Sequence, residues 1–102
     1  MIKMKVYTRG VEVLVAACDA DILGKVLRQG ELRLHVSSFY DGERVSEEEF
    51  LKQLGGATIG NLVGKVTVDA AKRAGYISDE GILWIDGVPH AQLFVMKEPV
   101  ES

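Results

Sequence analysis

The chain has 102 residues, with 12 basic and 15 acidic side chains and a formal net charge of −3. This length fits one hydrophobic core, and the negative charge excludes an overall field that attracts DNA or anionic membranes. Cys18 is the only cysteine, so an internal disulfide is excluded, and no apolar stretch is long enough to predict a membrane-spanning helix. We therefore expect a cytoplasmic protein.

The N-terminal region carries two strand patterns. Ile2, Met4 and Val6 alternate with polar residues, which is typical of a strand with one solvent-exposed face. After a turn at Arg9–Gly10, residues 11–17 are apolar almost throughout. This second run predicts a strand that is covered on both faces and lies centrally in the sheet.

A helix and a third strand are predicted next. Asp19 is a suitable N-cap, Gly30 a suitable stop, and the apolar residues between them have helical spacing: Ile22, Leu23, Val26 and Leu27. Over 31–36, apolar and polar residues alternate, which predicts a strand with a polar outer face.

Two helices are predicted in the centre of the chain. Ser46 and Glu49 form a capping box, and Val45 and Phe50 form a hydrophobic staple, so a helix begins there and ends at Gly55–Gly56. Thr58 is the predicted cap of a longer helix that ends at Gly75. Its buried stripe consists of Ile59, Leu62, Val63, Val66, Ala70 and Ala74, and its residues Gly60 and Gly64 allow close packing against a neighbour.

A β-hairpin completes the pattern. Residues 82–85 and 88–96 flank Asp86–Gly87, a pair that readily adopts a type I′ turn. Strands at both ends and helices between them indicate one α+β domain over 1–97, followed by a flexible tail over 98–102. We expect a small antiparallel or mixed sheet of about five strands that carries two or three helices.

His90 and Gln92 are the most interesting polar pair. A two-residue turn at Asp86–Gly87 places a common set of side chains on one face of the hairpin: Leu83, Ile85, Val88, His90, Gln92 and Phe94. His90 and Gln92 then lie about 7 Å apart on a mostly apolar surface. Ordinary hydrogen bonding at a partly exposed edge explains them, and the alternative is a binding or catalytic role.

Asp19, Asp21 and Lys25 form a second candidate cluster, beside Cys18. A metal or acid–base site is one interpretation, but helix capping explains the same residues, and we predict neither a metal nor a cofactor. The adjacent carboxylate raises the expected pKa of the thiol, which disfavours a reactive nucleophile. Nucleotide-binding motifs are absent from the sequence.

Lys3, Lys5 and Tyr7 form a candidate RNA-binding face, because all three project from the same side of the first predicted strand. Asn61, the only asparagine, can bind either a ligand or a neighbouring backbone group.

The sequence resembles an archaeal family known as domain-of-unknown-function family 424. The matching segments are MKVYTRG at 4–10, EVLVAACDADILGKVL at 12–27, FYDGE at 39–43, ATIGNLVGK at 57–65 and GVPHAQ at 87–92. The resemblance implies no assigned activity, and it implies a helper or partner in translation or ribosome-related machinery. A surface common to the family would include the special residues of these segments: Asp19, Asp21, Lys25, Thr58, Asn61, Pro89, His90 and Gln92.

A non-enzymatic protein-binding module, or a homo-oligomer, is the function we expect first. Residues of the AVILMFWYC set make up 47% of the chain, and no recognisable catalytic set accompanies them. One alternative is an RNA-binding accessory protein. The other is a small enzyme centred on His90, which requires His90 to share a pocket with Asp19 or Asp21.

Overall fold

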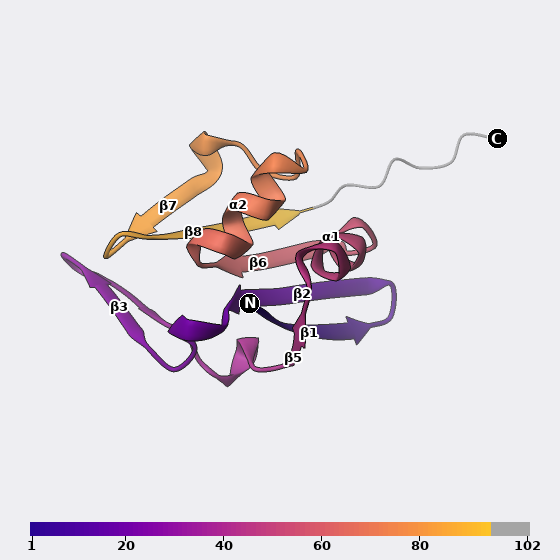
Figure 1. Ribbon diagram of the computed structural model, residues 1–102, viewed down its shortest axis with the longest axis horizontal. Coiled ribbons are helices and arrows are strands. Elements are labelled where there is room, and N and C mark those ends of the chain that lie inside the picture. The colour runs from indigo at the N-terminus through magenta and orange to yellow at the C-terminus, as the bar shows by residue number, and fades with distance from the viewer. Residues whose placement is uncertain (95–102) are drawn as a thin grey trace.

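A six-stranded mixed sheet, a separate two-stranded hairpin and two α-helices make up the computed structural model, which describes residues 1–94 (Figure 1). The strands are β1 (Ile2–Arg9), β2 (Glu12–Asp19), β3 (Val26–Gln29), β4 (Leu32–His35), β5 (Glu43–Val45), β6 (Ile59–Val63), β7 (Ile82–Ile85) and β8 (Val88–Phe94). The α-helices are α1 (Glu47–Gly55) and α2 (Lys65–Arg73), and the 3₁₀ turns are η1 (Ala20–Ile22), η2 (Ser38–Tyr40) and η3 (Asp79–Gly81).

The large sheet has the strand order β5-β1-β2-β6-β8-β7. Only β2 and β6 run parallel, and every other neighbouring pair is antiparallel. β3 and β4 pair with each other in the separate hairpin. The sheet therefore has two edges, which are formed by β5 and β7.

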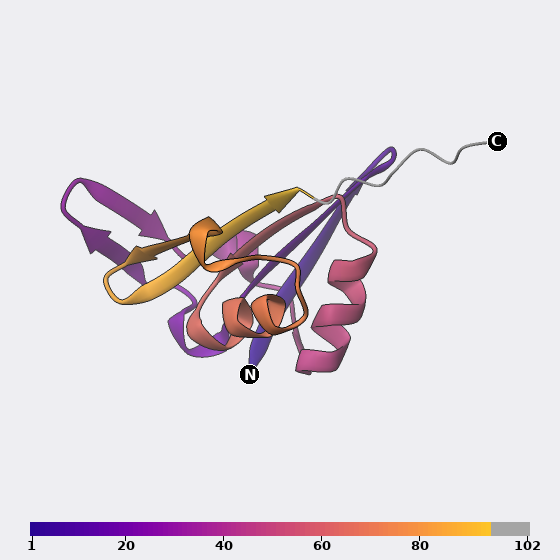
Figure 2. The same ribbon diagram turned by 90° about the horizontal axis from the view of Figure 1, so that it is seen from above.

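The two helices cover one face of the sheet (Figure 2). Phe50 and Leu54 of α1 and Val68 of α2 are almost completely buried there, against side chains such as Val15 and Leu62. Burying each side chain of this size contributes about 1.5–3 kcal/mol. This helix-covered side holds the larger of the two apolar clusters.

The opposite face of the sheet is covered only in part. Leu27 and Val36, from the region of the β3–β4 hairpin, and Tyr40 of η2 pack on Cys18 and Val63. Figure 2 shows the hairpin on the side of the sheet away from the helices. The remainder of this face carries the candidate site described below.

The strongest local signals of the sequence are confirmed. α1 begins after Ser46, whose Oγ accepts a hydrogen bond from the backbone N–H of Glu49 at 3.1 Å. Asp86 and Gly87 have φ values of 54° and 74°, as a type I′ turn requires. The expected α+β class and the central position of β2 are confirmed, with one more strand in the main sheet than expected and a separate hairpin. The expected strand residues 95–96 and the tail over 98–102 lie outside the described residues.

The prediction of a helix between Asp19 and Gly30 is wrong. The chain forms η1 and then the β3–β4 hairpin, which reverses at Gly30 with a φ of +60°. Gly30 is therefore a turn residue between two strands and does not end a helix. Of the apolar residues with helical spacing, Ile22 ends η1, Leu23 follows it, and Val26 and Leu27 lie in β3, where Leu27 is the buried residue.

The single long helix predicted from Thr58 is also wrong. Ile59–Val63 is a strand, and α2 begins only at Lys65. Gly60 lies in the strand against Leu93, and Gly64 has a φ of +115° at the point where the chain changes from strand to helix. The apolar run between these glycines reflects a strand buried in the sheet, between β2 and β8.

Candidate functional site

Three polar side chains meet on the partly covered face of the sheet. Strand pairing places Asn61 of β6 opposite Gln92 of β8, and His90 lies two residues before Gln92. Asn61 Oδ1 accepts a 2.6 Å hydrogen bond from the hydroxyl of Tyr40 and lies 3.2 Å from Nε2 of His90. The fold therefore brings together Asn61, His90 and Gln92, three of the residues that the sequence nominated.

Burial controls the protonation of this cluster. It lowers the pKa of His90 below 6.5, so the imidazole is neutral at pH 7. It also raises the pKa of Tyr40 to about 12, mainly by desolvation, so the phenol keeps its proton and donates to Asn61. With Asn61 Oδ1 as the shared acceptor, Nε2 of His90 is the protonated nitrogen and Nδ1 is left as an acceptor.

A row of apolar and aromatic side chains crosses the same face beside this cluster. Tyr7 pairs with Leu14, Leu14 with Ile59, and Ile59 with Phe94, so the row spans β1, β2, β6 and β8. Phe94 is 70% exposed. We call Tyr7, Leu14, Ile59 and Phe94, together with Lys5, Asn61 and Gln92, the open sheet face.

The candidate RNA contacts occupy one side of the open sheet face. The ammonium of Lys5 lies 5.2 Å from the ring centroid of Tyr7, and the Tyr7 hydroxyl donates to the carbonyl of Phe39 at 2.8 Å. Lys3, by contrast, pairs with Asp41 at 3.3 Å and is mostly buried. Lys5 is therefore available on this face, whereas Lys3 forms an ion pair and the Tyr7 ring is stacked on Phe39.

Asp19 has a structural role at a helix terminus. Its carboxylate accepts hydrogen bonds from the backbone N–H groups of Val66 and Thr67 and from the hydroxyl of Thr67. Capping by Asp19 was expected, but the capped helix is α2, which lies 47 residues further along the chain at Val66. This interaction connects the end of β2 to the start of α2.

An enzyme centred on His90 requires a pocket that His90 shares with Asp19 or Asp21, and Asp19 does not meet this requirement. In the β2–β6–β8 register, Cys18 aligns with Val63 and Val63 with His90, so His90 projects from the face that holds Cys18. Asp19 follows Cys18 and projects from the helix-covered face. No three His, Cys, Asp or Glu side chains within residues 1–94 are close enough together to hold a metal ion.

The remaining nominated residues lie apart from the cluster. Thr58 connects β2 to the start of β6, because its Oγ1 accepts from the N–H of Val13 at 2.9 Å and donates to Glu12 or to the Val13 carbonyl. Asp21 is exposed on η1, Lys25 is exposed before β3, and Pro89 is buried. The eight residues nominated from the family resemblance therefore do not form one surface.

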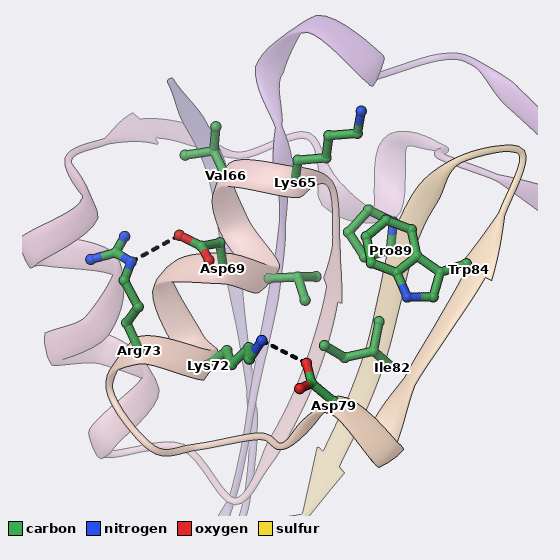
Figure 3. A pocket seen from close by; sticks show the side chains of 10 residues that line it. Lys65, Val66, Asp69, Lys72, Arg73, Asp79, Ile82, Trp84 and Pro89 are labelled. Carbon is green, nitrogen blue, oxygen red and sulfur yellow. Dashed lines mark hydrogen bonds and ion pairs between the residues drawn. The ribbon is translucent and has the colours of Figure 1, made fainter.

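A groove on the helix-covered side is a second candidate surface. It lies between α2 and the β7–β8 hairpin and has a volume of about 560 Å³ (Figure 3). Val66, Ile82, Trp84 and Pro89 supply apolar walls, and Trp84 is 52% exposed. No local sequence pattern indicates this groove, because its residues come from elements whose contact depends on the order of strands in the sheet.

The charges that line this groove largely neutralise one another. Lys72 Nζ pairs with Asp79 at 2.6 Å, and Arg73 Nε pairs with Asp69 at 2.8 Å. Figure 3 shows the Lys72–Asp79 pair beside Ile82, and the Arg73–Asp69 pair farther from Ile82 and Trp84. The groove is therefore suited to an apolar occupant.

Two arginines on the β3–β4 hairpin form a further pair that was not predicted from the sequence. Arg28 and Arg33 stand directly opposite each other in the strand register, and both are exposed. Their equal distance from the Gly30–Glu31 turn is the signal that could have revealed them, once the segment is recognised as a hairpin instead of a helix followed by a strand.

Comparisons with known proteins agree with this fold. No curated protein matches the chain. A crystal structure of an uncharacterized conserved protein from Methanopyrus kandleri matches it with a TM-score of 0.83 and 26% identity, over 99% of this chain and 97% of that chain. Within the described part of the chain, no helix is long and apolar enough to cross a membrane. Residues 7–96 match the family described as "Protein of unknown function (DUF424)", and the chain belongs to this family.

Proposed function

We propose that this chain is a cytoplasmic, non-enzymatic protein-binding module that binds a second copy of itself through the edge strand β7. The observation that carries the proposal is the contrast between the two edges of the sheet. β5 has only three residues and includes the charged Glu43 and Arg44, whereas β7 has the uncharged sequence Ile-Leu-Trp-Ile. Natural sheets protect free edges with charges and short strands, so an uncharged edge indicates a strand that a partner covers.

The backbone of β7 supports strand addition. Hydrogen-bonded and non-hydrogen-bonded pairs alternate along an antiparallel ladder. Pro89 has no N–H, so its pair with Trp84 is of the non-hydrogen-bonded kind. The N–H and C=O of Trp84 therefore point away from β8, toward the open side of the sheet.

The same strand is complementary to itself. In an antiparallel pair of β7 strands centred on Trp84, the N–H of each Trp84 donates to the carbonyl of the other around a two-fold axis. The pairing would also cover Leu83, which is 47% exposed, and Trp84 would lie beside the apolar groove. No charged side chain within Ile82–Ile85 opposes the contact.

Sedimentation velocity over a wide range of protein concentrations tests the proposal. The wild-type chain should form dimers, and Leu83→Lys should sediment as a monomer, because the new charge would be buried against the other copy. Val11→Lys is the control, since Val11 is 88% exposed in the turn between β1 and β2. A wild-type chain that stays monomeric at millimolar concentration, or a folded Leu83→Lys variant that still dimerises, overturns the proposal.

A further inference from the structure

We propose that the outer face of the β3–β4 hairpin and the open sheet face together bind single-stranded RNA. The proposed RNA surface uses side chains on one face of the sheet and of the hairpin, whereas self-association uses the backbone edge of β7, so neither proposal depends on the other. The two surfaces adjoin, because Leu83 of β7 lies opposite His90 in the strand register. The observation behind the RNA proposal is the pair of arginines on the hairpin, Arg28 and Arg33, whose repulsion does not stabilise the fold.

The arginine pair is unfavourable for the isolated protein. Arg28 and Arg33 occupy directly opposite positions on neighbouring strands, where like charges repel and destabilise the pairing. None of the four ion pairs within residues 1–94 includes either side chain. Leu27, which belongs to the opposite face of the hairpin, is only 4% exposed and holds the hairpin on the sheet. The guanidinium groups therefore face solvent, where a phosphate backbone would relieve their repulsion.

The open sheet face supplies hydrogen-bonding groups for bases. Asn61 Oδ1 is occupied by Tyr40 and His90, which leaves the amide N–H groups of Asn61 as available donors. Nδ1 of the neutral His90 is an acceptor, and the side-chain amide of Gln92 is exposed. Unpaired bases present donors and acceptors of this kind, whereas those of a duplex are already paired.

Aromatic rings flank these polar groups. Tyr7 and Phe39 stack with centroids 5.1 Å apart and ring planes 15° apart, and Lys5 lies over the Tyr7 ring, so this end of the row supplies a cation next to rings that already stack on each other. Phe94 offers an exposed ring at the other end of the row, about three strand spacings or 14 Å away. Stacking platforms combined with cations are characteristic of surfaces that bind single strands.

The distribution of charge favours this side of the molecule. The acidic first turn of α1, Glu47 to Glu49, lies on the helix-covered side of the sheet. Lys5 projects from the other side, and the β3–β4 hairpin, which carries Arg28 and Arg33, lies on that side (Figure 2). The net charge of −3 thus conceals a local basic surface on the hairpin, which lies near the β7–β8 turn, whereas Phe94 lies at the other end of β8.

Fluorescence anisotropy of a labelled, single-stranded RNA of mixed sequence tests the inference. We expect the wild-type chain to bind it, and to bind the same sequence in duplex form more weakly. The double variant Arg28→Ala/Arg33→Ala should bind about tenfold more weakly, and its plot of log affinity against log salt should be less steep by about 1.4 for two lost phosphate contacts. Lys52→Ala, on the opposite side of the sheet, is the matched control and should bind like the wild type.

Thermal unfolding separates a binding role from a structural one. Removing two repelling charges should leave the melting temperature of the double variant unchanged or higher, whereas a structural role would lower it. Phe94→Ala should also weaken binding by about tenfold through lost stacking. Undetectable RNA binding, equal affinity of the double variant, or binding to anionic vesicles in place of RNA overturns the inference.

Discussion

Oδ1 of Asp19 accepts two hydrogen bonds from Thr67, one from its backbone N–H and one from its hydroxyl, both at 2.8 Å. Oδ2 accepts a third from the N–H of Val66 at 3.0 Å. Gly64, at the N-cap position of α2, has no side chain with which to satisfy these groups. A carboxylate from the neighbouring strand therefore replaces a local cap, and it fixes the start of α2 on the sheet.

Replacing Asp19 with alanine should destabilise the protein by about 3 kcal/mol, because the helix loses its cap and the buried Thr67 hydroxyl loses its acceptor. Urea unfolding should show a lower midpoint with an unchanged slope. Asp21→Ala is the control, since Asp21 is exposed and the change should stay within about 0.5 kcal/mol. Equal midpoints for the two variants would contradict the capping role.

Gly64→Ala should cost at least about 3 kcal/mol for two separate reasons. Gly64 has a φ of +115°, and a Cβ there would lie 2.4 Å from Oδ1 of Asp19. Gly75→Ala is the matched control, because Gly75 also has a positive φ but a Cβ at that position would have no neighbouring atom within 4 Å. Combining Gly64→Ala with Asp19→Ala should cost less than the sum of the two, and additive losses in urea unfolding would rule out the clash.

Local signals predicted the parts of the fold whose interactions are local. Ser46 and Glu49 lie within one helical turn, and Asp86–Gly87 determines its own hairpin, so neither needs distant contacts. The prediction of one helix from Thr58 onward was wrong because β6 is buried in the middle of the sheet. A strand covered on both faces loses its alternation, and its apolar residues then also fit a helical spacing.

The candidate site depended on contacts that the sequence does not display. The position of the hairpin turn alone predicts that Leu83, His90 and Phe94 lie on one face. The strand register confirms this prediction. The meeting of His90 with Asn61 required the β6–β8 pairing, which no local pattern specifies. The pairing of Arg28 with Arg33 was not evident because Arg28 was assigned to a predicted helix and Arg33 to a separate predicted strand.

Cys18 should make the protein less stable at high pH. Burial first, and then Asp19, raise the pKa of its thiol from 9.0 to about 11. The folded state therefore favours the protonated thiol, so a contribution of about 2–3 kcal/mol is complete below pH 9 and is lost as the pH rises toward 11. The unfolding midpoint of the wild type should fall over this window more than that of Cys18→Ala. Ionisation of Tyr40 also lowers stability at high pH, in the wild type and in Cys18→Ala alike. Identical pH profiles of the two proteins would contradict the prediction.

His90 should titrate below pH 6.5, because burial penalises the imidazolium. Its pKa is depressed in the folded state, so its contribution to stability is present above pH 6.5 and is lost as the pH falls through the folded value. Nuclear magnetic resonance of the imidazole ¹⁵N nuclei measures both the midpoint and the tautomer, which should carry its proton on Nε2. His90→Gln assigns the signals, and a midpoint at or above 6.5 would refute the buried, neutral state.

Gly60 should tolerate a methyl group only if Leu93 changes with it. A Cβ at position 60 would lie 2.7 Å from Cδ2 of Leu93 and 3.2 Å from Cδ1 of Leu54, inside the cluster beneath the helices. Gly60→Ala should therefore cost about 1–3 kcal/mol through overpacking. Leu93→Ala alone should cost about 2–5 kcal/mol by leaving a cavity. Because the added methyl group would occupy part of that cavity, the double variant should lose less stability than the two single variants together, as measured by urea unfolding.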